Sequence, residues 1–393
     1  MINLFSSESV SEGHPDKLCD QVSDAILDAA LNQDPNSRVA VECFTTTGLL
    51  LVGGELTTKA QLNIAEIAKN TISRIGYNKP EYGFSSDTCN VMVCLNKQSS
   101  DIAIGVDKDS NLNKELGAGD QGSVFGYACN QSPSLMPLPI QIAHDLAKQI
   151  SISRKNKSIP YLRPDAKTQV TMEFENRIPK RIHTILISTQ HNPEVAQETI
   201  KNDLIEQIIK PNVNKNLIDP NTNIIINPTG RFVIGGPNGD AGLTGRKIIV
   251  DTYGGWSRHG GGAFSGKDAT KVDRSAAYMA RYIAKNIVAA NLADEIEIQI
   301  TYGIGLSNPI SITIETFNTE KINKKEIISL IKNNFNLTPE GIINELNLKK
   351  PIFEQTAAYG HFGRKDIEFE WEKTNKVKKL QEAVSKNLTK TTN

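Results

Sequence analysis

The sequence lacks an excess of charge of either sign, a membrane span and a secretion signal. Its 393 residues carry 44 lysines and arginines against 44 aspartates and glutamates, so the formal net charge at pH 7 is zero. Binding to nucleic acid or to a membrane surface needs one sign in excess. No run approaches the roughly 18 apolar residues of a membrane span, and residues 1–8 resemble no signal peptide. We therefore expect a cytoplasmic protein that binds neither nucleic acid nor a membrane.

Cysteine is scarce and unevenly placed. The five cysteines are an odd number, none has C-x-x-C spacing, and all lie in the first third of the chain: Cys19, Cys43, Cys89, Cys94 and Cys129. A disulfide framework or a zinc site would need even counts and closer pairs. We interpret these residues as reduced thiols, most of them buried.

Helical and strand-like patterns alternate along the chain and restart twice, with boundaries near residues 100–114 and 233. The expected helices span residues 15–31, 59–75, 139–150, 193–209, 268–290 and 324–333. The expected strands span residues 38–44, 49–55, 90–95, 169–175, 182–189, 223–226, 247–253, 296–302 and 310–317. From residue 373 on, the chain is lysine-rich and polar, which predicts a solvated helix with a frayed end.

Residues 98–122 interrupt these patterns with a polar, glycine-rich stretch. A loop of this length inside a compact domain is usually functional or disordered. We expect a flexible gating loop at residues 101–114 that closes over bound substrates. The segment GAGDQG at 117–122 fits the G-x-G-x-x-G spacing, but no hydrophobic strand precedes it, so a dinucleotide site is disfavoured. Asp107, Asp109 and Asn111 have EF-hand spacing, but Leu112 stands where glycine is required.

A second glycine-rich segment, GGAFSGKD at 261–268, resembles a phosphate-binding loop. It satisfies G-x-x-x-x-G-K, but Asp268 stands where a P-loop has Ser or Thr. Glycines that turn backbone N–H groups toward an anion, a lysine and a following helix start still favour phosphate binding. The alternative interpretation is a glycine-rich turn with a surface lysine.

The charges near these turns favour a polyphosphate with magnesium. Four cations stand at the glycine-rich turns 242–245 and 261–266: Arg246, Lys247, Lys267 and Lys271. The carboxylates of Asp240 and Asp273 are close in sequence, and Mg²⁺ bridges carboxylates and phosphate oxygens. Taken singly, each residue is more typical of a solvated surface.

The segment EGHPDK at 12–17 places His14 and Asp16 at the start of a helix. One interpretation is helix capping, with Asp16 complementing the helix dipole. The other makes Asp16 a magnesium ligand and His14 a donor to a phosphate or leaving oxygen. A serine or cysteine hydrolase is poorly supported, because the sequence contains no G-x-S-x-G motif.

Together these segments resemble the S-adenosylmethionine synthetase (methionine adenosyltransferase) family over residues 5–372. The resemblance is carried by EGHPDK at 12–17, GAGDQG at 117–122, the glycine-rich stretch 226–255, GGGAFSGKD at 260–268 and AAYGHFGR at 357–364. Residues 194–223 and 321–350 look divergent, and the loop 107–116 looks longer than in the family.

The resemblance implies an α+β fold of three similarly built domains around a pseudo-threefold axis. These domains would span residues 1–100, 115–233 and 234–375, with a polar tail at 376–393. It also implies a homo-oligomer, a tetramer built as a dimer of dimers, with active sites between subunits. The implied reaction joins ATP and L-methionine into S-adenosylmethionine and then cleaves the tripolyphosphate to pyrophosphate and phosphate. A pair of Mg²⁺ ions per active site and K⁺ are the implied cofactors.

The resemblance also assigns residues to roles. The implied catalytic set is His14, Lys167, Arg246, Lys247, Lys267 and Lys271. The implied ATP contacts are His14, Asp120, Asp165, Lys167, Arg231, Phe232, Arg246, Lys247, Ala263 and Lys267. The implied methionine contacts are Glu55, Gln98, Asp240 and Lys271, and the implied metal ligands are Asp16 and Asp273 for Mg²⁺ and Glu42 for K⁺.

This set of residues suits the chemistry, because a thioether sulfur loses no proton when it attacks C5′ and so needs no general base. Alignment and cations that stabilise the departing tripolyphosphate would lower the barrier. Two alternatives remain. A kinase-like phosphotransferase would attack phosphorus and release ADP, and a non-catalytic anion-binding protein would bind ATP without turnover.

Overall fold

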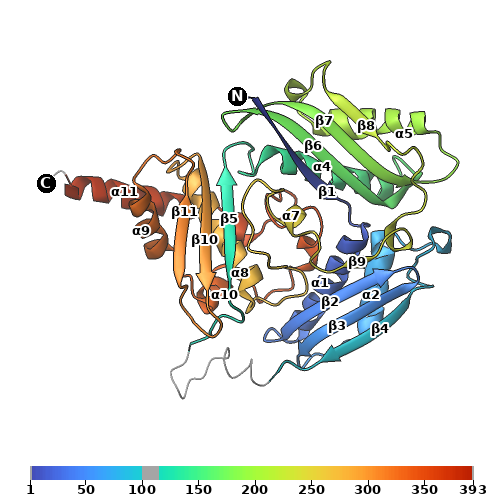
Figure 1. Ribbon diagram of the computed structural model, residues 1–393. Helices are drawn as coiled ribbons and strands as arrows, with labels where there is room; N and C mark the ends of the chain where they lie inside the picture. Colours follow the sequence, from blue (N-terminus) through green and yellow to red (C-terminus); the bar gives the residue numbers. More distant parts are fainter. Residues whose placement is uncertain (1, 100–114, 392–393) are drawn as a thin grey trace. The chain divides into compact units, whose positions relative to one another are not determined.

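The computed structural model describes residues 2–99 and 115–391 and divides the chain into two compact units. The first unit contains residues 1–96, 138–255 and 351–361, and the second contains residues 97–137, 256–350 and 362–393. Helices occur in both units, and the described strands form separate sheets, as Figure 1 shows. The α+β prediction is therefore confirmed.

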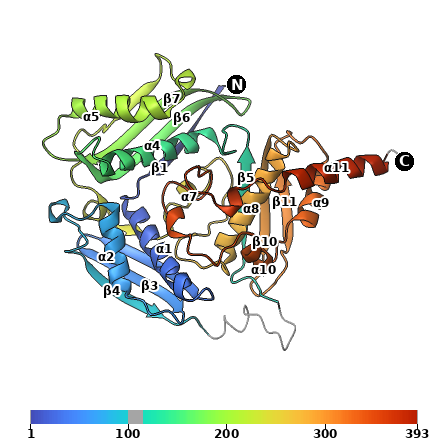
Figure 2. The same ribbon diagram turned by 180° about the vertical axis from the view of Figure 1, so that it is seen from behind.

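The first unit holds a sheet in the order β1-β6-β7-β8. Its strands are β1 (Ile2–Val10), β6 (Leu162–Glu175), β7 (Ile178–His191) and β8 (Asn223–Ile226). Helix α4 (Leu138–Lys155) packs on β6 and β1 (Figure 2). The chain between β7 and β8 forms a short helix, α5 (Gln197–Asp203), continued by a π-helical segment (Leu204–Ile209) and α6 (Lys210–Asn212).

The same unit holds a second sheet in the order β4-β3-β2-β9. Its strands are β2 (Arg38–Thr46), β3 (Leu49–Thr57), β4 (Asn90–Asn96) and β9 (Gly242–Leu243). Helices α1 (Pro15–Gln33) and α2 (Ile64–Ile75) cover one face, on which Val41 and Val52 are fully buried. Proline suits the first position of α1 because its missing N–H would have no helical partner there.

The second unit holds a sheet in the order β11-β10-β5. Its strands are β5 (Gly122–Cys129), β10 (Glu295–Tyr302) and β11 (Ser311–Glu315). The long buried helix α8 (Val272–Ala289) packs on β5 and β10. Helices α9 (Lys324–Asn334), α10 (Pro339–Glu345) and α11 (Val377–Thr391) complete the unit.

Each sheet contains a strand pair whose members are far apart in the sequence. β1 pairs with β6, β5 pairs with β10, and β9 pairs with β2. In Figure 1 the dark-blue β1 accordingly lies beside the green β6, and the turquoise β5 beside the orange β10. Since no sheet is built from one continuous stretch of chain, none can be completed until distant segments meet.

Several expected elements differ in the structure. The strand predicted at 247–253 is wrong: residues Ile248–Asp251 form a single helical turn, α7, because Asp251 N–H bonds the Lys247 carbonyl and the buried Asp251 side chain meets Lys17. The second predicted helix begins later, at Ile64, where the Asn63 side chain caps it. Strands β1 and β5 and helix α10 were not predicted.

The remaining expectations have mixed outcomes. All five cysteines are free, and only Cys94 is exposed. The predicted gating loop at 101–114 lies outside the described residues. Within residues 2–99 and 115–391, none of the helices combines the length and the apolar character that a membrane crossing needs.

The contact between α8 and β5 leads to a stability prediction. A Cβ on Gly126 would lie 2.1 Å from the Ala280 carbonyl carbon, so the strand and helix backbones touch there. Gly126→Ala should lower the thermal unfolding midpoint by several degrees, because overpacking a tight core costs about 1–3 kcal/mol. Gly122→Ala on the same strand is the control, since its Cβ would find its nearest neighbour at 3.7 Å. Equal midpoints for the two variants would contradict the close contact.

Candidate active site

His14 caps the helix α1. Its Nδ1 accepts a hydrogen bond from the Asp16 N–H at 3.1 Å, which leaves the proton of a neutral imidazole on Nε2 as a donor. Burial and the charge of Lys247 lower the pKa of His14 to about 3, so the ring is neutral at physiological pH. The capping interpretation and the donor interpretation are therefore compatible.

Asp16 is held by charge-assisted hydrogen bonds. Lys247 Nζ donates to Oδ2 at 2.6 Å, and the Leu243 N–H donates to Oδ1 at 3.0 Å. Burial alone would raise the pKa of Asp16, but the bonds from Lys247 and Leu243 outweigh it and keep the pKa below its ordinary value. The structure thus brings His14, Asp16 and Lys247 together as a neutral donor, a carboxylate and an ammonium group.

Asp165 and Lys167 lie on β6 within electrostatic range of this cluster. The Asp165 carboxylate accepts the Gly236 N–H at 2.8 Å through Oδ2, and its buried Oδ1 has no hydrogen-bond partner among the described residues. Burial raises the pKa of Asp165 to about 6. The exposed Lys167 acts in the opposite direction, because its charge lowers the pKa values of His14 and Asp165. The unpartnered oxygen offers an acceptor to a ligand.

A buried ion network fixes the segment that carries Arg246 and Lys247. Lys17 Nζ, fully buried, binds the Asp251 carboxylate and donates to Asp20 Oδ2 at 3.0 Å. Burial disfavours its charge, but the carboxylates of Asp20 and Asp251 outweigh this and raise the pKa of Lys17. Asp20 also accepts the Gly245 N–H at 2.8 Å. The segment therefore lies directly on α1.

Glycine is needed where this segment meets the helix start. A Cβ on Gly242 would lie 2.3 Å from the Pro15 carbonyl carbon. Any side chain would push Leu243 and the residues after it away from Asp16, so the hydrogen bonds described above depend on this close approach.

The other predicted residues of the first unit lie closer to the surface. They are Glu42, Glu55, Arg231, Phe232, Asp240 and Arg246, all exposed except the half-buried Phe232. Glu42 pairs with Gly53, and Glu55 pairs with Ala40, so the two glutamates lie diagonally on one face of the sheet. This is the outer face, opposite α1 and α2.

The second unit contains a cluster of similar composition. Lys267 Nζ bonds Asp273 Oδ2 at 2.7 Å, and Lys271 Nζ bonds Asp268 Oδ2 at 2.6 Å. Asp273 lies in the first turn of α8, and the Gly119 N–H bonds the Thr270 carbonyl at 3.2 Å. The segments GAGDQG and GGGAFSGKD therefore meet at the start of α8.

The remaining predicted residues belong to this unit. Asp120 is exposed, and its Oδ1 accepts the Gln121 N–H at 2.7 Å. Ala263 and Gln98 are half-buried. Each unit thus has a carboxylate in the first turn of a long buried helix, paired with a lysine from a glycine-rich segment: Asp16 with Lys247, and Asp273 with Lys267.

These carboxylates suit one mode of magnesium binding. Across the part of the chain that the structure describes, no group of three His, Cys, Asp or Glu side chains is placed to hold a metal ion. Mg²⁺ often takes only one or two carboxylates and completes its shell with water and substrate phosphates. Asp16 and Asp273 fit that mode rather than an all-protein site.

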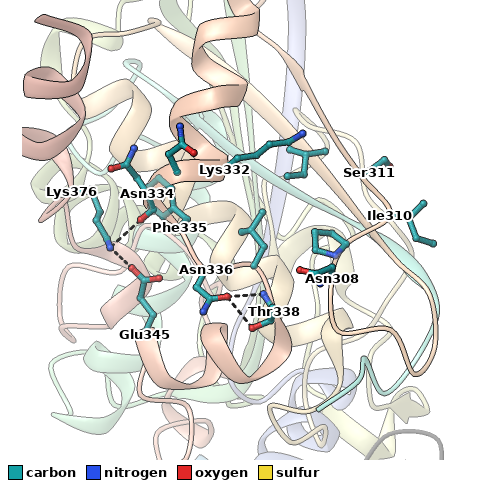
Figure 3. A pocket seen from close by; sticks show the side chains of 14 residues that line it. Asn308, Ile310, Ser311, Lys332, Asn334, Phe335, Asn336, Thr338, Glu345 and Lys376 are labelled. Atoms are coloured by element: carbon teal, nitrogen blue, oxygen red, sulfur yellow. Dashed lines mark hydrogen bonds and ion pairs between the residues drawn. The ribbon is translucent and has the colours of Figure 1, made fainter. Parts of the chain in front are cut away.

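A separate cavity of about 660 Å³ opens in the second unit between the start of β11 and the end of α9 (Figure 3). Lys376 Nζ lies beside it and bonds Glu345 Oε1 at 2.5 Å and the Asn334 carbonyl at 3.3 Å. None of the predicted site residues lines this cavity. The predicted site residues therefore lie outside this cavity.

Comparison with known proteins identifies the family. Three family models match in succession: the S-adenosylmethionine synthetase N-terminal domain at residues 2–100, the central domain at 115–232 and the C-terminal domain at 234–373. The chain belongs to the S-adenosylmethionine synthetase family. It is also 57% identical over 391 residues to the S-adenosylmethionine synthase of Clostridium tetani (strain Massachusetts / E88), covering 98% of this chain and all of that protein. The expectation of an enzyme of this family is confirmed.

Sequence reasoning missed the residues that support the S-adenosylmethionine synthetase motifs. Asp20 follows Asp16 by four positions and therefore lies on the same face of α1, a spacing that could have revealed it. Asp251 gave no such signal, because its apolar neighbours resemble a strand. Neither residue was assigned a role.

The buried ion network should dominate the stability of the first unit. Asp251→Ala should lower the free energy of unfolding by about 3–5 kcal/mol, because it leaves the Lys17 ammonium buried beside one carboxylate. Asp219→Ala is the matched control: Asp219 pairs with Arg181 at 2.7 Å near the surface, and its loss should cost far less than the loss of Asp251. Urea unfolding followed by circular dichroism measures both variants. Similar small losses in the two would show that the Lys17 network adds little.

Proposed function

We propose that the protein joins ATP and L-methionine into S-adenosylmethionine and then hydrolyses the bound tripolyphosphate to pyrophosphate and phosphate. The observation that carries this proposal is the recurring pair of a helix-start carboxylate and a lysine, Asp16 with Lys247 and Asp273 with Lys267. Such pairs can exchange partners. The carboxylate then turns to a cation and the lysine to a phosphate oxygen, so that neither charge is left unpaired.

In the first step a methionine sulfur lone pair forms a bond to C5′ of ATP. The bond between C5′ and the triphosphate oxygen breaks, its electron pair leaves with the tripolyphosphate, and sulfur becomes a sulfonium. Because His14 is neutral and Nε2 carries its proton, it can donate a hydrogen bond to the departing oxygen without transferring a proton. Lys247 and Arg246 would stabilise the charge that gathers on the phosphate chain.

The proposed cation ligands and substrate contacts are the residues that the family resemblance implies. Mg²⁺, when bound through Asp16 and Asp273, would neutralise phosphate charge, and Glu42 would hold K⁺. Methionine would be held by Glu55, Gln98, Asp240 and Lys271. Phe232 and Arg231 would contact the nucleoside, together with Asp120, Asp165, Lys167 and Ala263, and Lys267 would contact the phosphates. A cytoplasmic location remains a prediction.

The second step would cleave a phosphoanhydride. A tripolyphosphate surrounded by lysines and arginines would leave slowly, so hydrolysis before release makes physical sense. Water would attack phosphorus, and the cations would stabilise the bridging oxygen that departs. The kinase-like alternative would also attack phosphorus but would release ADP, so product analysis separates it from the proposed reaction.

We also propose a homo-oligomer, a tetramer built as a dimer of dimers, in which each active site takes residues from two subunits. The outer face of the sheet β4-β3-β2-β9 supports this. Phe44, Leu51 and Met92 lie in one row across three strands, and Met92 is 57% exposed. An apolar row on an exposed face favours burial against another chain, and Glu42 and Glu55 lie on the same face.

The function is tested by a product assay with a metal-site variant. Wild type incubated with ATP, methionine, Mg²⁺ and K⁺ should yield S-adenosylmethionine, pyrophosphate and phosphate, measured by chromatography and mass spectrometry. Asp16→Asn should lower turnover by orders of magnitude while leaving the fold intact, because it removes a metal ligand and keeps the shape of the side chain. Asp219→Asn, at the surface, should behave as wild type. Release of ADP would indicate the kinase-like reaction, and full activity in excess chelator would refute the metal assignment.

Shared active sites predict complementation between inactive variants. Glu55→Ala and Lys267→Ala should each be inactive alone, yet mixed subunits should regain part of the activity if one site takes the two residues from different chains. Sedimentation at the assay concentration gives the oligomeric state. A fully active monomer would contradict the proposal, and a mixture of exchanged subunits that stays inactive would show that Glu55 and Lys267 of one site come from the same chain.

A further inference from the structure

The last residues of β7 hold the segment 227–236 by hydrogen bonds within the first unit. The Thr189 N–H donates to Asn227 Oδ1 at 2.8 Å, and Gln190 Nε2 donates to the Val233 carbonyl at 3.0 Å. The segment between these anchors contains Arg231 and Phe232. A rigid strand therefore positions a stretch that has no regular structure of its own.

His191 forms two hydrogen bonds with the Phe232 backbone. Its own N–H donates to the Phe232 carbonyl at 3.0 Å, and its side-chain Nε2 accepts the Phe232 N–H at 3.1 Å. The imidazole thus replaces the acceptor that a neighbouring strand residue would supply in a sheet. His191 is only 4% exposed, so water does not readily take over this role.

A second hydrogen bond fixes which nitrogen of His191 faces the segment. Nδ1 lies 2.8 Å from the Asn192 carbonyl, which accepts a hydrogen bond and cannot donate one. The proton of the neutral ring is therefore on Nδ1, and Nε2 is free to accept. Hydrogen bonds at both ring nitrogens therefore hold His191 in a single tautomer.

The Phe232 side chain is positioned by the same anchor. The ring is half-buried, and a Cβ on Gly235 would lie 2.8 Å from Phe232 Cε2 and 2.9 Å from Gln190 Cδ. One side of the ring therefore lies against the segment and β7. The Val233 carbonyl is held by Gln190 and also by Arg163 Nη1 at 3.2 Å. With the backbone fixed at Phe232 and Val233, the aromatic ring has little freedom to shift.

We propose that His191 is a positioning residue for the nucleoside end of ATP. It would act through Phe232, whose exposed ring surface would stack on the base, and it would touch neither substrate nor phosphate. This inference rests on the proposed function, since it takes Phe232 as a nucleoside contact. The phosphate-binding lysines Lys247 and Lys267 stand on other segments, so the loss of His191 should weaken ATP binding without weakening tripolyphosphate hydrolysis.

Two polar substitutions distinguish the roles of the two ring nitrogens of His191. Glutamine places an amide oxygen near the position of Nε2, whereas asparagine reaches only as far as Nδ1. His191→Asn should raise the KM for ATP about tenfold with kcat changed far less, because a buried N–H loses its acceptor. His191→Gln should stay within about twofold of wild type. His183→Asn on the same strand is the matched control, because the His183 ring bonds its neighbour Thr184 at Oγ1, 2.8 Å away, and not the segment that carries Phe232.

The readouts are the KM for ATP, kcat, hydrolysis of added tripolyphosphate without methionine, and the melting temperature. The expected result is a raised KM in His191→Asn alone, with its tripolyphosphate hydrolysis equal to that of wild type. Equal KM values in all variants would overturn the inference, and so would a parallel loss of tripolyphosphate hydrolysis, which would indicate a general structural role. A wild type that forms no sulfonium product would instead refute the proposed function.

Discussion

The buried ammonium group of Lys17 joins two parts of the first unit that are far apart in the sequence. It can lose its hydration only if Asp20 and Asp251 reach it together, because a buried charge must be paired. The start of α1 and the segment 242–251 must therefore fold as one element. That coupling places Lys247 against Asp16, and it also explains why residues 248–251 form a turn instead of the strand that their β-branched side chains favour.

The paired charges at the helix starts have a consequence for ligand binding. Asp16 with Lys247 and Asp273 with Lys267 are each close to neutral as pairs, so the desolvation of these charges is already compensated before a ligand arrives. In the proposed reaction, a polyphosphate accompanied by a divalent cation would give each carboxylate a cation and each lysine a phosphate oxygen in place of its present partner. A phosphate without the cation would leave the carboxylates unpaired and would bind less well. In the proposed function, the arrangement would therefore favour the metal complex of the nucleotide over the free anion.

Sequence patterns predicted the helices and strands that depend on neighbouring residues and missed those that depend on residues far away in the sequence. The start of α1 was readable from Pro15 and the helical spacing of Leu18, Val22 and Ile26, and the hairpin β2–β3 from its two apolar runs. Strand β1 was missed because its polar sequence makes no strand pattern until β6 supplies the pairing. Strand β5 was missed because the glycine-rich stretch directly before it obscured the strand pattern. The motifs indicated the chemistry of the site, but Asp251 and His191 act through residues that only the fold brings near.

In the proposed reaction the first unit would hold ATP from two separately anchored ends. The phosphate side depends on α1 through Lys17 and Asp20, and the nucleoside side depends on β7 through His191. Attack at C5′ requires sulfur, carbon and the leaving oxygen to lie in line, and small misplacements are costly. C5′ lies between the base and the phosphates, so fixing only one end would leave it free to swing about the ribose. Two independent anchors on rigid elements restrict that motion, which is why residues with no contact to the substrate can matter to the chemistry.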